Sequence, residues 1–316
     1  MYHASFRQLQ SLVLVAQHQS VSKAANALHV TQPAVSLQLR TLEEITGAAL
    51  TRKVGRSIQL TAAGEVMAEF SERILRLWEQ AGDELAALNG IASGTLRIGA
   101  VTTAEHLLPP LLVPFTTLRP DVRLKLQVGN RVEIVNMLAR QEIDLAIMGT
   151  PPRELRTNAA RFARHPMGFV ASPGHPLMKQ RKVTLADVLQ ANLMVRERGS
   201  GTRTAVEKLF KDAGHALNFG SEVSSNEAIK RMVSAGLGLG FLSVHACALE
   251  FGAGLIRLLP VQGNPVEGDW HVMHLAGHPI PKVAAAFQDF VIDQGQDLVQ
   301  RELEAFYQRA PRTRKA

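Results

Sequence analysis

Cysteine and long apolar runs are the scarcest features of this sequence. Its 316 residues include one cysteine, Cys247, which excludes an intramolecular disulfide framework and fits a reducing compartment. No apolar run approaches the length of a membrane span, and the apolar segment 11–16 is too short for the core of a signal peptide. These absences predict a cytoplasmic protein with no membrane partner.

Recognisable catalytic patterns are also missing. The sequence has no carboxylate pair like that of glycosidases and no Gly-x-Ser-x-Gly nucleophile elbow. Its eleven histidines are scattered, and His271 and His274 would lie on opposite faces of a strand, so they predict no metal site. The glycine-rich segment 236–240 enters a predicted strand, the reverse of a dinucleotide-binding loop. We expect no enzyme activity, no catalytic residue, no metal and no cofactor.

Positive charge, by contrast, is abundant. The chain carries a formal net charge of +7. In residues 1–62 the acidic side chains are only Glu43 and Glu44, against Arg7, Lys23, Arg40, Arg52, Lys53 and Arg56. A local excess of basic groups suits electrostatic binding to the phosphates of DNA.

Segment 20–44 carries the most informative pattern. Ser20 is suited to cap a helix over 21–28, and Thr31 is suited to cap a second helix with Pro33 in its first turn. The inward face of that second helix is expected to hold Val35, Leu39, Leu42 and Thr46. Two short helices joined by a tight turn predict a DNA-reading helix-turn-helix. The alternative is an ordinary helical hairpin with a solvated polar face.

The outward face and a following wing supply the candidate DNA contacts. Gln32 lies at the helix tip and can pair bidentately with adenine, and Leu37 can touch a thymine methyl group. Strands expected over 50–53 and 57–60 form a wing around Gly55 with a basic edge. The full set of candidate DNA-binding residues is Thr31, Gln32, Pro33, Ser36, Leu37, Arg40, Arg52, Lys53 and Arg56.

A long helix capped by Thr61 is expected over 62–89. Its apolar residues recur at spacings of three and four, and they are Met67, Phe70, Ile74, Leu77, Ala81, Leu85 and Leu88. Such a seam is buried when two copies pair, which predicts a homodimer or homotetramer on a roughly palindromic double-stranded DNA site. The alternative is a helix that lies on its own domain.

Beyond residue 93, strand-like and helix-like segments alternate. Strands are expected at 95–101, 124–128, 144–148, 167–171, 193–196, 222–223, 239–242, 255–258 and 269–275. Helices are expected near 109–118 and at 131–140, 202–213, 226–235, 244–251 and 282–293, and Asn130 and Glu133 form a capping box for the second of these. The alternation predicts parallel β/α units in two lobes, with the last strand and helix returning to the first lobe.

Two α/β lobes enclose a cleft where strand ends meet helix starts, and open α/β sheets bind ligands there. Hydroxyls and free helix N–H groups at such turns favour a small anionic effector. The candidate effector-binding residues are Thr102, Thr103, Arg131, Gly149, Thr150, Arg198, Ser200, Gly201, Thr202, Arg203 and Asn226. The alternative is plain helix capping, because Ser, Thr and Asn are common at helix starts.

These patterns divide the chain into four parts. The expected domains are a winged helix-turn-helix over 1–61, a linker and dimerisation helix over 62–90, and an effector-binding domain over 91–296. In the last, the first lobe takes 91–165 and 266–296, and the second takes 166–265. A C-terminal helix and basic tail are expected over 297–316.

Two motifs in the N-terminal part are specific. They are Ala24-Ala25-x-x-Leu28-x-Val30-Thr31-Gln32-Pro33-Ala34-Val35-Ser36, continuing to Leu42-Glu43, and Leu60-Thr61-x-x-Gly64. Through them the chain resembles the LysR-type transcriptional regulators over nearly its whole length. Segments 129–131, 144–149, 198–203 and 225–229 resemble more particularly the regulators of carbon-fixation (RuBisCO) operons. Thr150, Pro151 and Pro152 depart from the arginine that this subfamily carries after Gly149.

The resemblance implies a winged helix-turn-helix, a linker-helix dimer that often pairs again, and a two-lobed α/β domain of periplasmic-binding-protein type. It implies constitutive binding near promoters, with a co-inducer in the cleft that changes DNA bending and contact with RNA polymerase. Carbon-fixation relatives sense sugar phosphates, phosphoenolpyruvate or reduced nicotinamide nucleotide.

Three other functions stay open from the residues alone. The two lobes by themselves would suit a solute-binding protein, which the N-terminal DNA module opposes. A phosphate-metabolite-handling enzyme with an appended DNA-binding module is the second, for which no catalytic constellation is present. The third is a nucleoid-type architectural protein, which would show no preference for one promoter.

Overall fold

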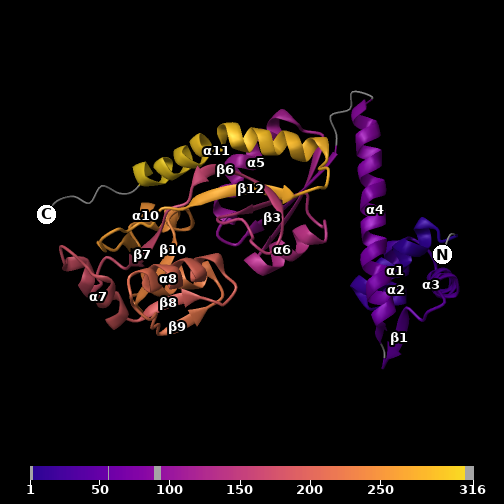
Figure 1. Ribbon diagram of the computed structural model, residues 1–316, viewed down its shortest axis with the longest axis horizontal. Helices are drawn as coiled ribbons and strands as arrows, with labels where there is room; N and C mark the ends of the chain where they lie inside the picture. The colour runs from indigo at the N-terminus through magenta and orange to yellow at the C-terminus, as the bar shows by residue number, and fades with distance from the viewer. Residues whose placement is uncertain (1–2, 56, 89–93, 310–316) are drawn as a thin grey trace. The chain divides into compact units, whose positions relative to one another are not determined.

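The computed structural model describes residues 3–55, 57–88 and 94–309 of the chain. The chain divides into two compact units, Met1–Gly90 and Ile91–Ala316. Figure 1 shows a helical first unit and an α/β second unit, and each is described by itself.

Three helices form the body of the first unit: α1 (Phe6–His18), α2 (Val21–Ala27) and α3 (Gln32–Thr46). As expected, the Ser20 hydroxyl caps α2 by accepting from Lys23 N at 3.3 Å. The left-handed backbone of His29, with φ of 53°, turns the chain from α2 into α3. The core of this unit includes Leu12, Val15, Val35, Leu39, Leu42 and Leu50. The predicted inward face of the second helix is thus confirmed, with Thr46 half-buried at its end.

A two-stranded wing and a long helix complete the first unit. Strands β1 (Thr51–Val54) and β2 (Ser57–Leu60) pair antiparallel, in the positions expected to within one residue. Helix α4 (Ala62–Leu88) begins behind Thr61, whose hydroxyl accepts from Gly64 N at 3.0 Å. Of the expected seam, Met67 packs on the core of the unit. Phe70, Ile74, Leu77 and Leu85 are exposed, whereas the Leu88 side chain lies outside the described residues.

The first lobe of the second unit is built on one five-stranded sheet, in the order β4-β3-β5-β12-β6. Its strands are β3 (Gly94–Val101), β4 (Val122–Gly129), β5 (Leu145–Met148), β6 (Thr157–Arg164) and β12 (Asp269–Leu275). Strand β3 pairs parallel with β4 and β5, as predicted. Strand β12 returns to this sheet, also as predicted, but it runs antiparallel to β5 and β6.

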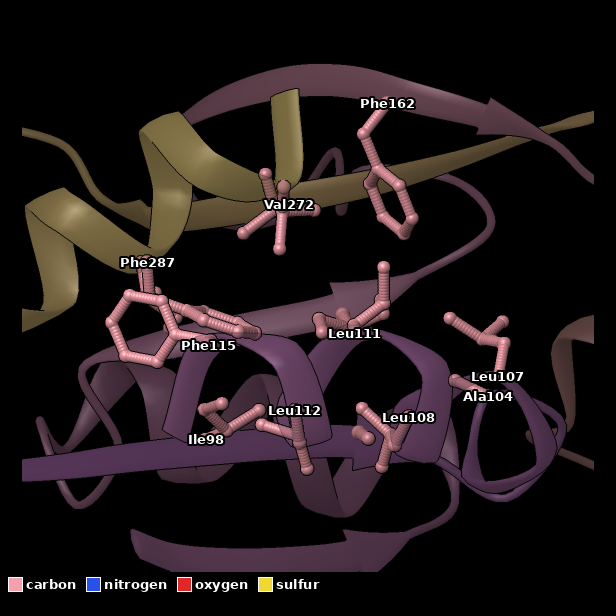
Figure 2. Packing of buried hydrophobic residues seen from close by; sticks show 14 of the residues in the cluster. Ile98, Ala104, Leu107, Leu108, Leu111, Leu112, Phe115, Phe162, Val272 and Phe287 are labelled. Carbon is pink, nitrogen blue, oxygen red and sulfur yellow. The ribbon is translucent and has the colours of Figure 1, made fainter. Parts of the chain in front are cut away.

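Side chains of alternate residues along the strands supply the two faces of this sheet. Leu145 and Ile147 face a core shared with α5 (Leu108–Leu118) and α11 (Lys282–Arg309). Figure 2 shows Phe115 of α5 against Phe287 of α11, and their ring centroids lie 5.0 Å apart. Ala146 and Met148 face the opposite core, covered by α6 (Arg131–Ala139). Full burial of each such large side chain contributes about 1.5–3 kcal/mol.

The second lobe repeats this architecture on a sheet of order β11-β7-β10-β8-β9. Its strands are β7 (Met167–Ala171), β8 (Leu193–Arg196), β9 (Ser221–Val223), β10 (Leu239–Ser243) and β11 (Arg257–Leu258). Phe169 and Phe241 face Phe210 of α8 (Gly201–Asp212) and the short helix α7 (Leu185–Gln190). Val170 and Leu242 face the other way, toward α9 (Asn226–Ser234).

Several elements differ from the sequence-based prediction. Strand β6 and helix α7 were not expected, and β7, β11 and β12 are antiparallel to their neighbours in otherwise parallel sheets. The prediction of a separate C-terminal helix from 297 is wrong, because α11 runs unbroken from Lys282 to Arg309. This helix covers the first lobe and then packs on α10 (Ala248–Gly252) of the second lobe. The basic tail lies outside the described residues. Among the described residues, no helix is long and apolar enough to cross a membrane.

Candidate DNA and effector sites

Helix α3 presents a polar outward face, as the helical wheel predicted. Thr31, Gln32, Pro33 and Arg40 are exposed, and Ser36 is half-buried. Leu37 is 63% exposed, an uncommon position for leucine that leaves its methyl groups free to contact another molecule. The opposite face is buried in the unit, so α3 is held rigidly with this surface outward.

The start of α3 is open. Thr31 occupies the N-cap position with extended backbone, but its hydroxyl makes no cap hydrogen bond, which corrects the expectation that it would. The first amides of a helix have no partner within the helix. Pro33 has no N–H, and Ala34 N donates to Thr31 O at 3.1 Å. The uncapped start therefore offers the Gln32 N–H and the Thr31 hydroxyl to an anionic partner such as a phosphate.

The wing carries exposed basic side chains. Arg52 and Lys53 of β1 are both exposed, and Arg52 Nη2 donates to Gln59 Oε1 at 3.5 Å across the hairpin. Arg56, the third basic residue expected at the tip, lies outside the described residues. The described part of the wing thus presents the guanidinium group of Arg52 and the ammonium group of Lys53, and both are suited to contacts with phosphates.

A cavity of about 840 Å³ separates the two lobes of the second unit. Eight of the eleven expected effector residues line it, and they are Thr102, Thr103, Arg131, Gly149, Thr150, Ser200, Gly201 and Thr202. A cavity of this size suits a metabolite, because ligand pockets measure about 300–1,000 Å³.

The helix starts around the cavity are not equivalent. At α6, the Asn130 side chain accepts from Glu133 N at 3.0 Å, and Glu133 accepts in return from Asn130 N. At α8, Ser200 occupies the N-cap position but makes no side-chain cap bond. The start of α8 lies in the cavity wall with the buried hydroxyl of Thr202, so it is the open anion site of the two.

Arg196 is a cavity residue that the sequence did not single out. It ends β8, and its side chain is 1% exposed. Its guanidinium pairs with Glu197 at 2.7 Å, contacts Asn226 Oδ1, and donates to Thr102 Oγ1 of the first lobe at 3.3 Å. The signal was present as a lone arginine at the end of an apolar strand.

Three expected effector residues do not line the cavity. Arg203 is buried beside Phe219 and pairs with Glu207 at 2.5 Å and Glu222 at 3.5 Å. Asn226 is buried and serves Arg196, and Arg198 is exposed outside the lining. The arginines that line the cavity are Arg131, Arg153 and Arg196.

Two histidines lie near the junction of the lobes, His165 buried and His245 half-buried. His165 lines the cavity and stacks on Trp270 with ring centroids 3.6 Å apart. Burial, with His245 nearby, lowers the pKa of His165 to about 3. Burial also lowers the pKa of His245 to about 4, and Trp270 Nε1 donates to its Nδ1 at 3.3 Å. Both rings are neutral at pH 7, and His165 Nε2 is buried with no hydrogen-bond partner.

Two protein-family models match the chain. One is described as the LysR substrate binding domain and matches residues 89–296. The other is described as a bacterial regulatory helix-turn-helix protein of the lysR family and matches residues 6–65.

Relatives of known function match nearly the whole chain. A RuBisCO operon transcriptional regulator of Allochromatium vinosum is 36% identical over 292 residues, 92% of this chain and 97% of the relative. The transcriptional regulator CfxR of Cupriavidus necator is 38% identical over 298 residues, 94% of each protein. The regulator CbbR of Rhodospirillum rubrum is 40% identical over 285 residues, 90% of this chain and 95% of the relative.

Solved structures agree. CbnR, a LysR family transcriptional regulator, superposes with a TM-score of 0.72 at 26% identity, covering 93% of this chain and all of CbnR. CbnR in complex with its target DNA gives 0.71 at 26% identity, covering 91% of this chain and 98% of CbnR. The regulatory domain of Synechocystis CcmR in complex with 2-PG gives 0.60 at 31% identity, covering 63% of this chain and 96% of that domain.

Proposed function

The chain belongs to the LysR family of transcriptional regulators, and we propose that a small anionic metabolite in its cleft controls how it binds and bends promoter DNA. The observation that carries the proposal is the uncapped start of α8. It faces a cavity of about 840 Å³ together with the Thr202 hydroxyl and the buried Arg196 guanidinium. Free amides at a helix start favour an anion, and Arg196, although paired with Glu197, adds guanidinium N–H donors beside them.

The cavity also links the lobes, which is how binding would be transmitted. Arg196 of the second lobe donates to Thr102 of the first lobe at 3.3 Å. An anion between these groups would exchange that bond for contacts with both lobes and bias their separation. A ligand shifts such an equilibrium only by its difference in affinity for the two arrangements. We propose that this shift changes DNA bending and contact with RNA polymerase.

On the DNA side, we propose that the outward face of α3 reads the major groove while the wing holds the phosphate backbone. Gln32 and Leu37 are exposed on that face. The exposed seam of α4, with Leu77 60% and Leu85 62% exposed, would pair with a second copy. Two paired copies present two recognition helices, so the promoter site is roughly palindromic. The assembly is a homodimer or homotetramer.

A metabolite panel tests the effector proposal. Full-length protein is melted with 2-PG, sugar phosphates, phosphoenolpyruvate or reduced nicotinamide nucleotide, and with unphosphorylated sugars as neutral controls. A bound ligand raises the melting temperature by mass action. We expect anionic compounds to raise it and Thr202→Val to abolish the rise. The matched control is Thr117→Val. The Thr117 hydroxyl lies on the exposed face of α5 and donates to Val113 O at 2.8 Å. A rise kept in Thr202→Val would remove this hydroxyl from the effector site.

Competition binding tests the DNA proposal. Gln32→Ala should reduce the preference for a promoter fragment over random DNA by about 1–3 kcal/mol, because one bidentate base contact is lost. The control is Gln17→Ala, an exposed glutamine of α1. Footprinting with and without the stabilising metabolite then tests the coupling. Identical protection and bending in both states would contradict it.

A further inference from the structure

Three metal-ligating side chains meet outside the cleft, and they come from both lobes. Glu105 and His106 belong to the short helix η1 (Glu105–Leu107) of the first lobe, and Glu227 belongs to the first turn of α9 in the second. One ligand atom of each lies within 4.8 Å of the other two. His106 Nε2 is 3.4 Å from Glu105 Oε1 and 3.6 Å from Glu227 Oε1.

These separations suit a shared metal ion better than hydrogen bonds. A hydrogen bond from a ring N–H to a carboxylate is expected at about 2.7–2.9 Å. Ligand bonds of about 2.0–2.2 Å place the nitrogen and oxygen atoms of a tetrahedral Zn²⁺ site about 3.4 Å apart. His106 Nε2 is in fact buried without a hydrogen-bond partner, although two carboxylates flank it. The imidazole nitrogen and the two carboxylate oxygens are thus close enough together to bind one ion.

The charges around these three side chains favour a dication. Lys230 donates to Ala246 O at 2.8 Å and pairs with Glu227 at 2.5 Å and Glu250 at 3.0 Å. The carboxylates of Glu105, Glu227 and Glu250 and the ammonium of Lys230, beside a neutral imidazole, leave two negative charges in excess. One divalent cation balances them.

The lysine does not block the site. Lys230 Nζ contacts Glu227 Oε1, the same oxygen that lies 3.6 Å from His106 Nε2. A metal ion would therefore use a second lone pair of that oxygen or the other oxygen, Oε2, since a carboxylate offers about four lone-pair positions. A neutral imidazole is a common metal ligand.

We propose that Glu105, His106 and Glu227 form a binding site for a divalent transition-metal ion of the Zn²⁺ type, which joins the two lobes. One nitrogen and two oxygen ligands suit Zn²⁺ and Co²⁺ rather than Ca²⁺, which takes six to eight oxygens. Because two ligands come from one lobe and the third from the other, the bound ion holds the lobes at a fixed separation. The proposal does not depend on the effector proposed above.

Direct metal binding tests this site. Full-length protein without a histidine tag is stripped with a chelator and titrated with Zn²⁺ by calorimetry, and with Co²⁺ by visible absorption. We expect one tight site per chain, the bands of four-coordinate Co²⁺, and a melting temperature that rises with Zn²⁺. Glu105→Gln and His106→Gln should each weaken Zn²⁺ binding at least tenfold, since loss of even an outer-shell partner costs about 10–100-fold.

Two further variants make the result decisive. Glu227→Gln removes the ligand from the second lobe and should weaken Zn²⁺ binding like the other two, with circular dichroism to verify folding because Lys230 loses a partner. His215→Gln changes an exposed histidine outside the cluster and should bind Zn²⁺ as the wild type does. Wild-type protein that binds no Zn²⁺ or Co²⁺, or one-to-one binding that survives all three ligand substitutions, would overturn the proposal.

Discussion

In the two lobes of the effector unit, the helices that start at the shared cleft differ in their N-terminal capping. In the first lobe, α6 starts with a reciprocal capping box between Asn130 and Glu133. In the second lobe, α8 starts behind Ser200, which makes no cap bond. The first unit repeats this contrast, since the Ser20 hydroxyl caps α2 whereas Thr31 leaves α3 uncapped.

The contrast holds across the described part of the chain. Cap bonds are made by Ser5, Ser20, Thr61, Asn130, Thr184 and Ser225. Among the described helices that begin behind Ser, Thr or Asn, only α3 and α8 lack one. These two helices lie at the proposed DNA and effector sites. The difference teaches that a helix start whose amides are satisfied internally supports the fold, while an open start is available to an anion.

The largest effect should come from closing the open start in the second lobe. Ser200→Asp places a carboxylate over the amides of α8, where it caps the helix and repels an anionic effector. We expect the affinity for the most stabilising compound of the metabolite panel to fall at least about a hundredfold, measured by calorimetry. Ser225→Asp is the control, because α9 is already capped. Equal losses in both variants would show that α8 is no more open to anions than α9.

The His165 ring is a further polar group in the cavity without a hydrogen-bond partner, and it should lower the stability of the fold at acidic pH. His165 has a pKa of about 3 in the fold against about 6.5 when unfolded. Above pH 6.5 neither state binds the proton. As the pH falls below 6.5 the unfolded chain takes it up first, so stability is lost progressively until about pH 3.

At pH 5 this single group should cost the effector unit about 2 kcal/mol. Urea unfolding followed by the fluorescence of Trp270, in a Trp78→Phe background, measures it. His245 acts in the same direction, with a pKa of about 4. His165→Phe keeps the ring stack on Trp270 and should remove about half of the combined acid effect. An unchanged pH dependence in that variant would assign the effect to other groups.

An aspartate at the open start of α3 in the first unit should raise stability while it lowers DNA affinity. Thr31→Asp caps α3 and raises the stability of the unit by about 0.5–1 kcal/mol. The new charge repels phosphates, so affinity for all DNA sequences should fall about tenfold, measured by fluorescence anisotropy at fixed salt. Ser20→Asp exchanges one capping side chain for another and serves as the control. Thr31→Asp protein that binds DNA as the wild type does would contradict an open anion site at α3.

The sequence predicted most elements because their periodicity and caps are local properties. The capping box of α6 and the cap of α4 were readable from Asn130, Glu133 and Thr61. Strand β6 was missed because its sequence, Thr157–Arg164, has no regular alternation of apolar residues. Phe162 is buried only in the assembled fold, where β6 lies beside β12 and packs against α11. The antiparallel direction of β12 was equally out of reach, because strand direction depends on the path of the whole chain.

The site was predicted less completely than the fold, for a related reason. Thr202 and Arg203 are neighbours on the first turn of α8, yet one lines the cavity and the other contacts Phe219 and Glu222. Successive residues of a helix point about 100° apart, so orientation about the axis decides which of them meets a ligand. That orientation is set by packing on β8 and β10, which no local pattern encodes. Arg196 was missed because its partners come from two lobes.

The smallest effect separates the two kinds of helix start without any ligand. Ser225→Ala and Ser20→Ala delete existing cap bonds and should each lower stability by about 1 kcal/mol. Ser200→Ala and Thr31→Ala delete hydroxyls that make no cap bond, so each should change stability by less than about 0.5 kcal/mol. Urea denaturation of the full chain, without metabolite or DNA, measures all four. All four are N-cap residues and each pair takes one from each unit, so neither helix position nor unit explains a difference between the pairs. Equal costs would mean that all four side chains act as caps in solution.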